Sequence, residues 1–179
     1  MNHIKIALFR FLRYGLCPLL TVLWLCFIFG NSLQSGVESS EQSGKVHQIV
    51  NEVAQSVGIE EPISEKAVRK GAHFLEFAIL SSLICTDLFC FGLVKLKAKP
   101  TALLTSLCAV PLCAILAMID EYIQTFSAGR SCQWEDVLLD TSGAALAAVC
   151  FLGVCFALRA LIGRKKAVQT RQEKDGAAV

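Results

Sequence analysis

The sequence predicts an all-α integral membrane protein: a four-helix bundle of membrane spans with one external amphipathic helix. Three observations lead to this prediction. The 179 residues are 54% hydrophobic and only 18% charged, which is more apolar than a water-soluble domain of this length. The apolar residues form long blocks and do not follow an amphipathic period. Most lysines and arginines lie before the first block, between the second and third blocks, and after the last block.

Four apolar windows qualify as spans, because a bilayer core needs about 20 helical residues. They cover residues 14–29, 72–94, 100–119 and 141–158. The first and the last window are short. The first can be extended, because no charge lies between Arg13 and Glu38. Four spans are therefore the most economical number.

The chain divides into a cytoplasmic basic lead (1–13), a four-span membrane domain (14–160) with an external loop (31–71), and a flexible basic and polar tail (161–179). Most of the 17 lysines and arginines lie in the lead, between the second and third spans, and in the tail. The positive-inside rule then places both termini in the cytoplasm. We expect a multi-pass protein of the bacterial cytoplasmic (inner) membrane, whose first apolar stretch is retained because no signal-peptide cleavage pattern follows it.

All of the nine cysteines except Cys132 lie in the apolar windows, where cysteine acts as a small hydrophobic residue. A single external thiol cannot close a disulfide within its own loop. We therefore predict no disulfide framework, and the role of Cys132 stays open.

The external loop contains apolar residues at helical spacing: Val46, Ile49, Val50, Val53 and Val57. This spacing predicts an amphipathic helix on the outer membrane surface. Gly58 is expected to end that helix, and Ser64 is a suitable N-cap for the helix of the second span. Ser32 and Gln34, just after the first span, are interpreted as a frayed helix end among lipid head groups rather than as part of a site.

The second span opens with a polar stripe. Arg69, His73 and Glu76 stand at i, i+4 and i+7, on one face of a helix, and Lys70 lies beside them. Ionisable side chains within a span are costly and indicate a functional site by default.

A second polar group surrounds the loop between the third and fourth spans: Asp120, Glu121, Gln124, Arg130, Asp136 and Asp140. A charge in hydrocarbon is stable only when it is paired or hydrated, so we expect the two groups to face each other. The result is a polar cleft that opens outward beneath the amphipathic helix. Gly129 supplies backbone freedom for the turn. Gly143 and Ala147 follow as a stripe of small residues that permits close helix packing, including a homo-oligomer.

These residues resemble a known family. The pattern is Arg69-Lys70-x-x-His73-Phe74-x-Glu76-Phe77, then Asp120-Glu121-x-x-Gln124, Arg130, Asp136 and Asp140-x-x-Gly143, with Ser32-x-Gln34-Ser35 upstream. It resembles the VanZ-like family of bacterial membrane proteins, in which tyrosine is common at position 77 and asparagine at position 140. The resemblance implies a multi-pass cell-envelope protein. The family's namesake is linked to low-level resistance to the glycopeptide teicoplanin, while the biochemical activity is not settled by the resemblance.

Three hypotheses remain for the polar groups. They can bind an anionic lipid or lipid-linked cell-wall component, through Arg69, Lys70, His73, Glu76, Asp120, Glu121, Gln124, Arg130 and Asp136. They can catalyse a reaction on a lipid phosphate, with His73, Glu76, Asp120 and Glu121 as candidate catalytic residues, although no nucleophile is evident. They can also be buried ion pairs that dock the helices, so whether the chain is an enzyme is left open.

We predict no cofactor and no metal. His73-x-x-Glu76 with Asp120 or Glu121 can hold a divalent ion, but one histidine is thin support for zinc. The expected partners are the lipid bilayer, an anionic lipid or lipid-linked cell-wall component, and a second copy through Gly143 and Ala147. The sequence contains no nucleic-acid motif.

Overall fold

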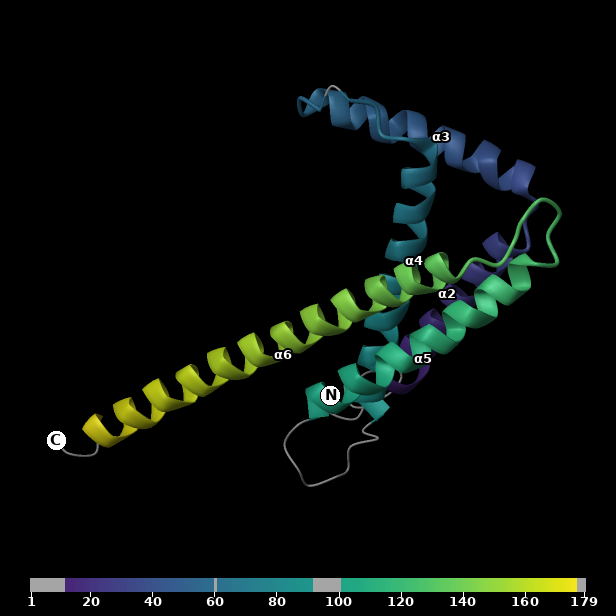
Figure 1. Cartoon of the computed structure of the whole chain (residues 1–179). Helices are drawn as coiled ribbons and strands as arrows, with labels where there is room; N and C mark the ends of the chain where they lie inside the picture. Colours follow the sequence, from purple (N-terminus) through teal and green to yellow (C-terminus); the bar gives the residue numbers. More distant parts are fainter. Residues whose placement is uncertain (1–11, 60, 92–100, 177–179) are drawn as a thin grey trace.

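The computed structural model describes residues 12–59, 61–91 and 101–176. In chain order, its elements are a π-helical turn η1 (Leu12–Leu16) and the helices α2 (Cys17–Ser32), α3 (Gly36–Ser56), α4 (Glu65–Phe91), α5 (Thr101–Gln124) and α6 (Trp134–Gly176) (Figure 1). No strand occurs within these ranges. The predicted all-α class is confirmed.

Four helical segments are long and apolar enough to cross a membrane: Tyr14–Ser32, Glu65–Phe91, Ala102–Gln124 and Trp134–Arg164. The predicted number of spans is confirmed, but the helices extend beyond the predicted windows at the end that carries the polar groups. The third runs to Gln124 instead of stopping at residue 119, and the fourth begins at Trp134 instead of residue 141. Polar residues continue these helices because they face one another there and not lipid.

Helix α6 also continues beyond the predicted end of the fourth span at residue 158, as far as Gly176. Its 43 residues make it about 64 Å long at 1.5 Å per residue, roughly twice the thickness of a bilayer core. The segment 161–176 is therefore helical, which agrees with its content of alanine, lysine, arginine, glutamine and glutamate. The flexibility predicted for this tail stays a prediction.

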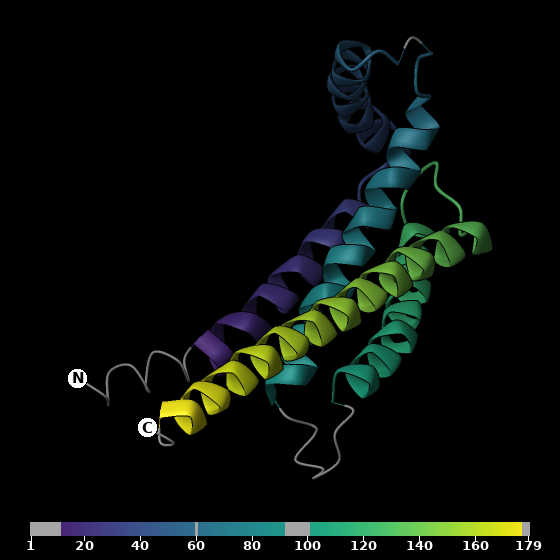
Figure 2. The ribbon, with the colours of Figure 1, turned by 90° about the vertical axis from the view of Figure 1, so that its left-hand side faces the viewer.

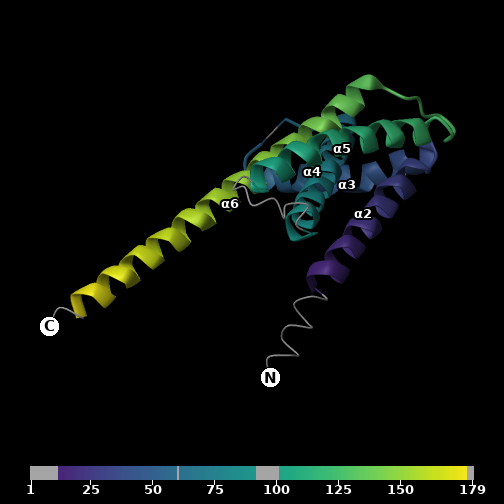
Figure 3. The same ribbon diagram turned by 90° about the horizontal axis from the view of Figure 1, so that it is seen from below.

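Helix α4 is central, because it contacts α2, α3, α5 and α6. Figure 2 shows α2, α4 and α6 running from one end of the molecule to the other, with α3 lying across the end of α4. Seen from below, α2 and α6 diverge from the region where α4 and α5 lie between them (Figure 3). The apolar core between the spans includes Ile28, Phe77, Leu80, Ala117 and Ala144.

The contact between α4 and α6 is close because small residues line it. A Cβ on Gly143 would lie 2.3 Å from the backbone oxygen of Phe74. Two turns farther along α4, the Ser81 hydroxyl donates a hydrogen bond of 2.9 Å to the carbonyl of Ala144. Gly143 and Ala147 are both buried within the chain, so the predicted homo-oligomer through these residues is corrected: α4 of the same chain occupies the stripe.

Replacing Gly143 with alanine is expected to lower the free energy of unfolding by about 1–3 kcal/mol, because the added methyl must push α4 away from α6. Gly153→Ala in the same helix is the control, since nothing lies within 4 Å of its Cβ and alanine favours a helix. Thermal unfolding in detergent measures both variants. Equal effects of the two substitutions would contradict the packing described here.

Helix α3 begins at a capping box. The Ser35 Oγ accepts a hydrogen bond of 3.3 Å from the amide of Glu38, and the Glu38 carboxylate accepts one of 2.9 Å from the amide of Ser35. Farther along, the predicted amphipathic segment is helical, and Ile49 and Val53 expose 61% and 58% of their surface, as a helix on the membrane surface requires. Gly58 adopts φ 88° after this helix, as expected.

The capping box makes the start of α3 sensitive to acid. Hydrogen bonds from Ser35, first through its amide and then through its hydroxyl, lower the pKa of Glu38 from its ordinary value of 4.5. A lowered pKa stabilises the folded state above 4.5, and this stabilisation is lost as the pH falls through the lowered value. The protection of amides in the first turn of α3 against hydrogen exchange, relative to the intrinsic exchange rate at each pH, should therefore decrease below that value. Glu38→Gln should remove this pH dependence; its persistence would contradict the assignment.

Candidate functional site

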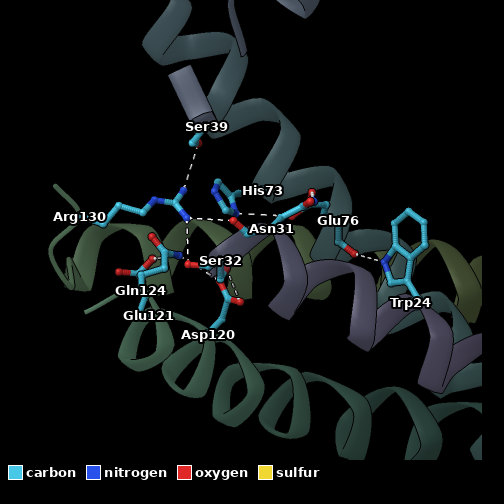
Figure 4. A network of polar contacts seen from close by, with 10 residues as sticks. All are labelled: Trp24, Asn31, Ser32, Ser39, His73, Glu76, Asp120, Glu121, Gln124 and Arg130. Carbon is cyan, nitrogen blue, oxygen red and sulfur yellow. Dashed lines mark hydrogen bonds and ion pairs between the residues drawn. The ribbon is translucent and has the colours of Figure 1, made fainter. Parts of the chain in front are cut away.

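Polar residues of α2, α3, α4, α5 and the loop after α5 meet at one end of the bundle (Figure 4). Helices α2 and α5 end there, α4 and α6 have their N-terminal turns there, and α3 lies above. Because these helix ends are adjacent, residues far apart in the sequence come within hydrogen-bond distance of one another. The network in Figure 4 includes residues from Trp24 to Arg130.

The last turn of α2 is built into the site. The Ser32 hydroxyl donates a hydrogen bond of 2.6 Å to Asp120 Oδ1, and both residues have an exposed fraction of 0%. The Ser32 carbonyl accepts a hydrogen bond of 2.9 Å from the Ser127 hydroxyl. The interpretation of Ser32 as a frayed end among head groups is therefore wrong: α5 and its following loop cover it.

The loop after α5 carries Arg130 over the end of α2. Gly129 adopts φ 78°, as expected for the turn, and the amide of Gly36 donates to the carbonyl of Ala128 at 2.9 Å. Arg130 Nη1 then donates to the last carbonyls of α2, those of Asn31 and Ser32, at 3.2 and 3.3 Å. A cation at a helix C-terminus is favourable, because the helix dipole is negative there.

Two guanidinium groups lie near each other at this point. Burial, followed by the charge of Arg69, lowers the pKa of Arg130. Arginine nevertheless keeps its charge at neutral pH. In the described part of the chain no carboxylate lies within 4.0 Å of either guanidinium, so this side of the site carries excess positive charge.

Arg69 itself has no side-chain hydrogen bond or ion pair to any residue that the structure describes. It is half-buried in the first turns of α4. Its neighbour Lys70 differs, because Lys70 Nζ lies 2.8 Å from Asp136 Oδ1 and 4.0 Å from Glu135 Oε2. Lys70 and Asp136 therefore connect α4 to α6, whereas the charge of Arg69 is not used within the fold.

The acidic side of the site lies at the end of α5. Gln124 Nε2 donates to Asp120 at 3.0 Å and to Glu121 at 2.8 Å. The second Glu121 oxygen accepts a hydrogen bond of 2.8 Å from the amide of Gln133. Both carboxylates are buried, and these donors satisfy part of the hydrogen-bonding capacity that burial removes from water.

Glu76 and His73 complete the α4 stripe. Asn31 Nδ2 donates to Glu76 Oε1 at 3.1 Å, and the indole of Trp24 donates to the Glu76 carbonyl at 2.9 Å. His73 Nδ1 lies 3.5 Å from Glu76 Oε2. Helix α2 thus contacts the stripe along two turns, and the site is not limited to α4, α5 and α6 as the sequence predicted.

Two cavities open at this end. The larger, about 690 Å³, is lined by residues of α3, α4, α6 and the loop after α5, among them Ser40, Arg69, Lys70, His73, Gln124, Arg130 and Asp136. The smaller, about 190 Å³, has polar and apolar walls, among them Phe27, Gln34, Val46, Val68, Ala72 and Glu76. Arg69, His73 and Arg130 line both cavities. Each cavity thus lies beneath or beside α3, where the sequence predicted a polar cleft.

Asp140 lies deeper in the bundle, on α6. One oxygen of Asp140, one oxygen of Asp120 and one ring nitrogen of His73 all lie within 4.8 Å of one another. These three atoms come from three helices. An imidazole nitrogen and two carboxylate oxygens are a donor set that suits a divalent metal ion.

The comparison with protein families agrees with this geometry. The sequence model described as VanZ/LLP1 matches residues 18–158, which include every residue of the site. The chain belongs to the VanZ/LLP1 family. The predicted VanZ-like resemblance is thereby confirmed, and this VanZ/LLP1 protein is a membrane protein with four candidate spans. Searches among curated proteins and among solved structures found no match.

Sequence reasoning missed three contributors to the VanZ/LLP1 site: Asn31, Ser39 and the buried contact of Ser32. Arg130 Nη2 donates to Ser39 Oγ at 3.4 Å, so α3 takes part as well. A signal was present, because Asn31 and Ser32 are polar residues in the last turn of an apolar span. Such residues are as consistent with a buried partner as with head groups, and only the position of α5 distinguishes the two.

Asp136→Asn should lower the free energy of unfolding, because it removes the carboxylate that lies 2.8 Å from the Lys70 ammonium. Glu135→Gln is the matched control. Glu135 lies farther from Lys70, and 83% of its side chain is exposed, so its removal should cost less than about 0.5 kcal/mol. Chemical unfolding in detergent compares them, and a larger effect at Glu135 would contradict the assignment.

Proposed function

We propose that this VanZ/LLP1 protein binds the anionic head group of a lipid or lipid-linked envelope component at the outer face of the bacterial cytoplasmic membrane. The observation that carries the proposal is the unpaired charge of Arg69. This guanidinium lines both cavities, and no described carboxylate neutralises it. A planar guanidinium fork suits phosphate oxygens.

The distribution of basic residues supports the orientation. Lysines and arginines concentrate before α2, between α4 and α5 and after α6, and such segments face the cytoplasm. The cavities lie at the opposite ends of these helices, so they face outward in this orientation. Both termini are then cytoplasmic.

The two cavities fit the two parts of a lipid. The larger one offers Arg69, Lys70 and Arg130 to a head group. The smaller one includes apolar walls, and two of its residues, Phe27 and Val46, expose 47% and 45% of their surface. In a membrane these exposed residues face acyl chains, so a hydrocarbon tail can leave the site through the smaller cavity.

The ligand classes that fit are a phospholipid, a polyprenyl phosphate and a teichoic-acid lipid, because each places a phosphate at the membrane surface. We also propose an effect on susceptibility to glycopeptides of the teicoplanin type. Such antibiotics act at the envelope. A protein that binds a lipid-linked component there changes how much of that component is available.

A second candidate function is catalysis on a lipid phosphate. It rests on the 3.5 Å approach of His73 Nδ1 to Glu76, which can orient the imidazole as a general acid or base. His73→Gln should abolish turnover of a lipid phosphate under this function. Under the binding function the same variant should weaken lipid retention only modestly.

Arg69→Ala should reduce retention of an anionic lipid about tenfold or more, since a hydrogen bond to a charged group contributes about 1.5–3 kcal/mol. The thermal midpoint should stay unchanged, because Arg69 has no described partner to lose. Native mass spectrometry from mild detergent, after incubation with phosphatidylglycerol or with a polyprenyl phosphate, measures retention and separates the two sources of phosphate.

Lys66→Ala is the matched control, because Lys66 is an exposed cation one turn earlier in α4 and lines neither cavity. It should leave lipid retention unchanged. If Arg69→Ala lowers the thermal midpoint and leaves lipid retention unchanged, the polar groups serve to dock the helices and the binding proposal fails.

A further inference from the structure

Asp140 is the most isolated carboxylate of the site. Its exposed fraction is 1%, and neither of its oxygens has a hydrogen-bond partner among the residues that the structure describes. In the part of the chain that the structure describes, no lysine, arginine or histidine nitrogen forms an ion pair with it. A buried carboxylate without partners costs several kcal/mol, so a partner that is not part of the protein is expected.

The atoms around Asp140 indicate what this partner is. Ligand atoms of His73, Asp120 and Asp140 lie within 4.8 Å of one another. Donor atoms bound tetrahedrally to one ion at about 2.1 Å lie about 3.4 Å apart. Side-chain movements of about 1 Å therefore let all three donor atoms reach one ion. We infer that His73, Asp120 and Asp140 bind a divalent transition-metal ion between α4, α5 and α6.

The other acids of the site are already engaged. Glu121 accepts hydrogen bonds from Gln124 and from the amide of Gln133, and Asp136 is held by Lys70. Asp120 accepts one hydrogen bond on each oxygen, which leaves lone pairs for an ion. Two carboxylates and one divalent ion are together neutral, whereas the two carboxylates alone are not.

The donor types favour a metal of the Zn²⁺ or Mn²⁺ class. An imidazole nitrogen is a good ligand for these ions, while Ca²⁺ and Mg²⁺ prefer all-oxygen sites. Three protein ligands leave at least one coordination position for water or another oxygen. His73 also lines both cavities, so this position can be reached by an anion that binds Arg69 and Arg130.

The sequence alone predicts no metal, because a single histidine, His73, is thin support for a zinc site. The burial of Asp140 and its approach to His73 and Asp120 depend on tertiary contacts that the sequence does not reveal. The metal site stands independently of lipid binding, because the ion is measured without added lipid.

The test uses the full-length protein in detergent, stripped with a chelator and dialysed against Zn²⁺ alone or Mn²⁺ alone. Elemental analysis should find about one ion per chain with one of the two metals. Asp140→Asn keeps the shape and removes the charge, and it should lower the affinity about tenfold or more. Glu135→Gln alters an acid of the same helix whose side chain is 83% exposed and which lies outside the ligand set, and it should retain the ion.

Less than about one-tenth of an ion per wild-type chain with both metals would overturn the inference, as would full retention by Asp140→Asn. If Asp140→Asn fails to elute as a folded species in size exclusion, His73→Gln takes its place with the same expectations. The thermal midpoint of the wild type should also rise with the bound ion, since the ion binds only the folded site; an unchanged midpoint at saturating metal would count against the site.

Discussion

The polar end of this VanZ/LLP1 protein depends on the hydrogen bond between Ser32 and Asp120. It joins the last turn of α2 to the last turns of α5, and both residues are fully buried. Arg130 strengthens the same junction, because it donates to the final carbonyls of α2. Without α2, Asp120 would face hydrocarbon, where an unpaired charge is not stable. The polar residues of the other spans are therefore stable at that depth only because the first span covers them.

This junction divides the charges into two layers. Arg69 and Arg130 line the two cavities, whereas Asp120 and Asp140 are buried below them. Within the described residues only Lys70 forms ion pairs across helices, with Asp136 at 2.8 Å and with Glu135 at 4.0 Å. A site with cations at its opening and unpaired carboxylates at its floor fits an anion above and a metal ion below. Part of this separation follows from the chain path, because Arg130 lies in the loop after α5, whereas Asp120 and Asp140 lie within α5 and α6.

Much of this architecture could be predicted from the sequence. The four spans, the cap at Ser64 and the turn at Gly129 follow from local properties: apolar block length, side-chain capping and backbone freedom. The structure agrees at each point, since the Ala67 amide donates to Ser64 Oγ at 3.2 Å. The convergence of the two polar groups also follows, because charges within spans must be sheltered from lipid.

What could not be predicted depends on which helices become neighbours. The sequence shows that Gly143 permits close packing, but not that its partner is Phe74 of the same chain. It shows that Ser32 is polar, but not that α5 covers it. Asp140 stands on the same face of α6 as Asp136. Asp136 is paired with Lys70, whereas Asp140 has no hydrogen-bond partner among the described residues. Such differences arise from tertiary contacts, which no single span encodes.

The most direct test of the central claim is a double-mutant cycle with Ser32→Ala and Asp120→Ala, measured by unfolding in detergent. If the last turn of α2 is hydrogen-bonded to Asp120, the two substitutions should show a coupling energy of about 1–2 kcal/mol. Effects that add within about 0.3 kcal/mol would contradict it, because residues without a direct contact behave independently. The four helix ends would then not form the common site described here.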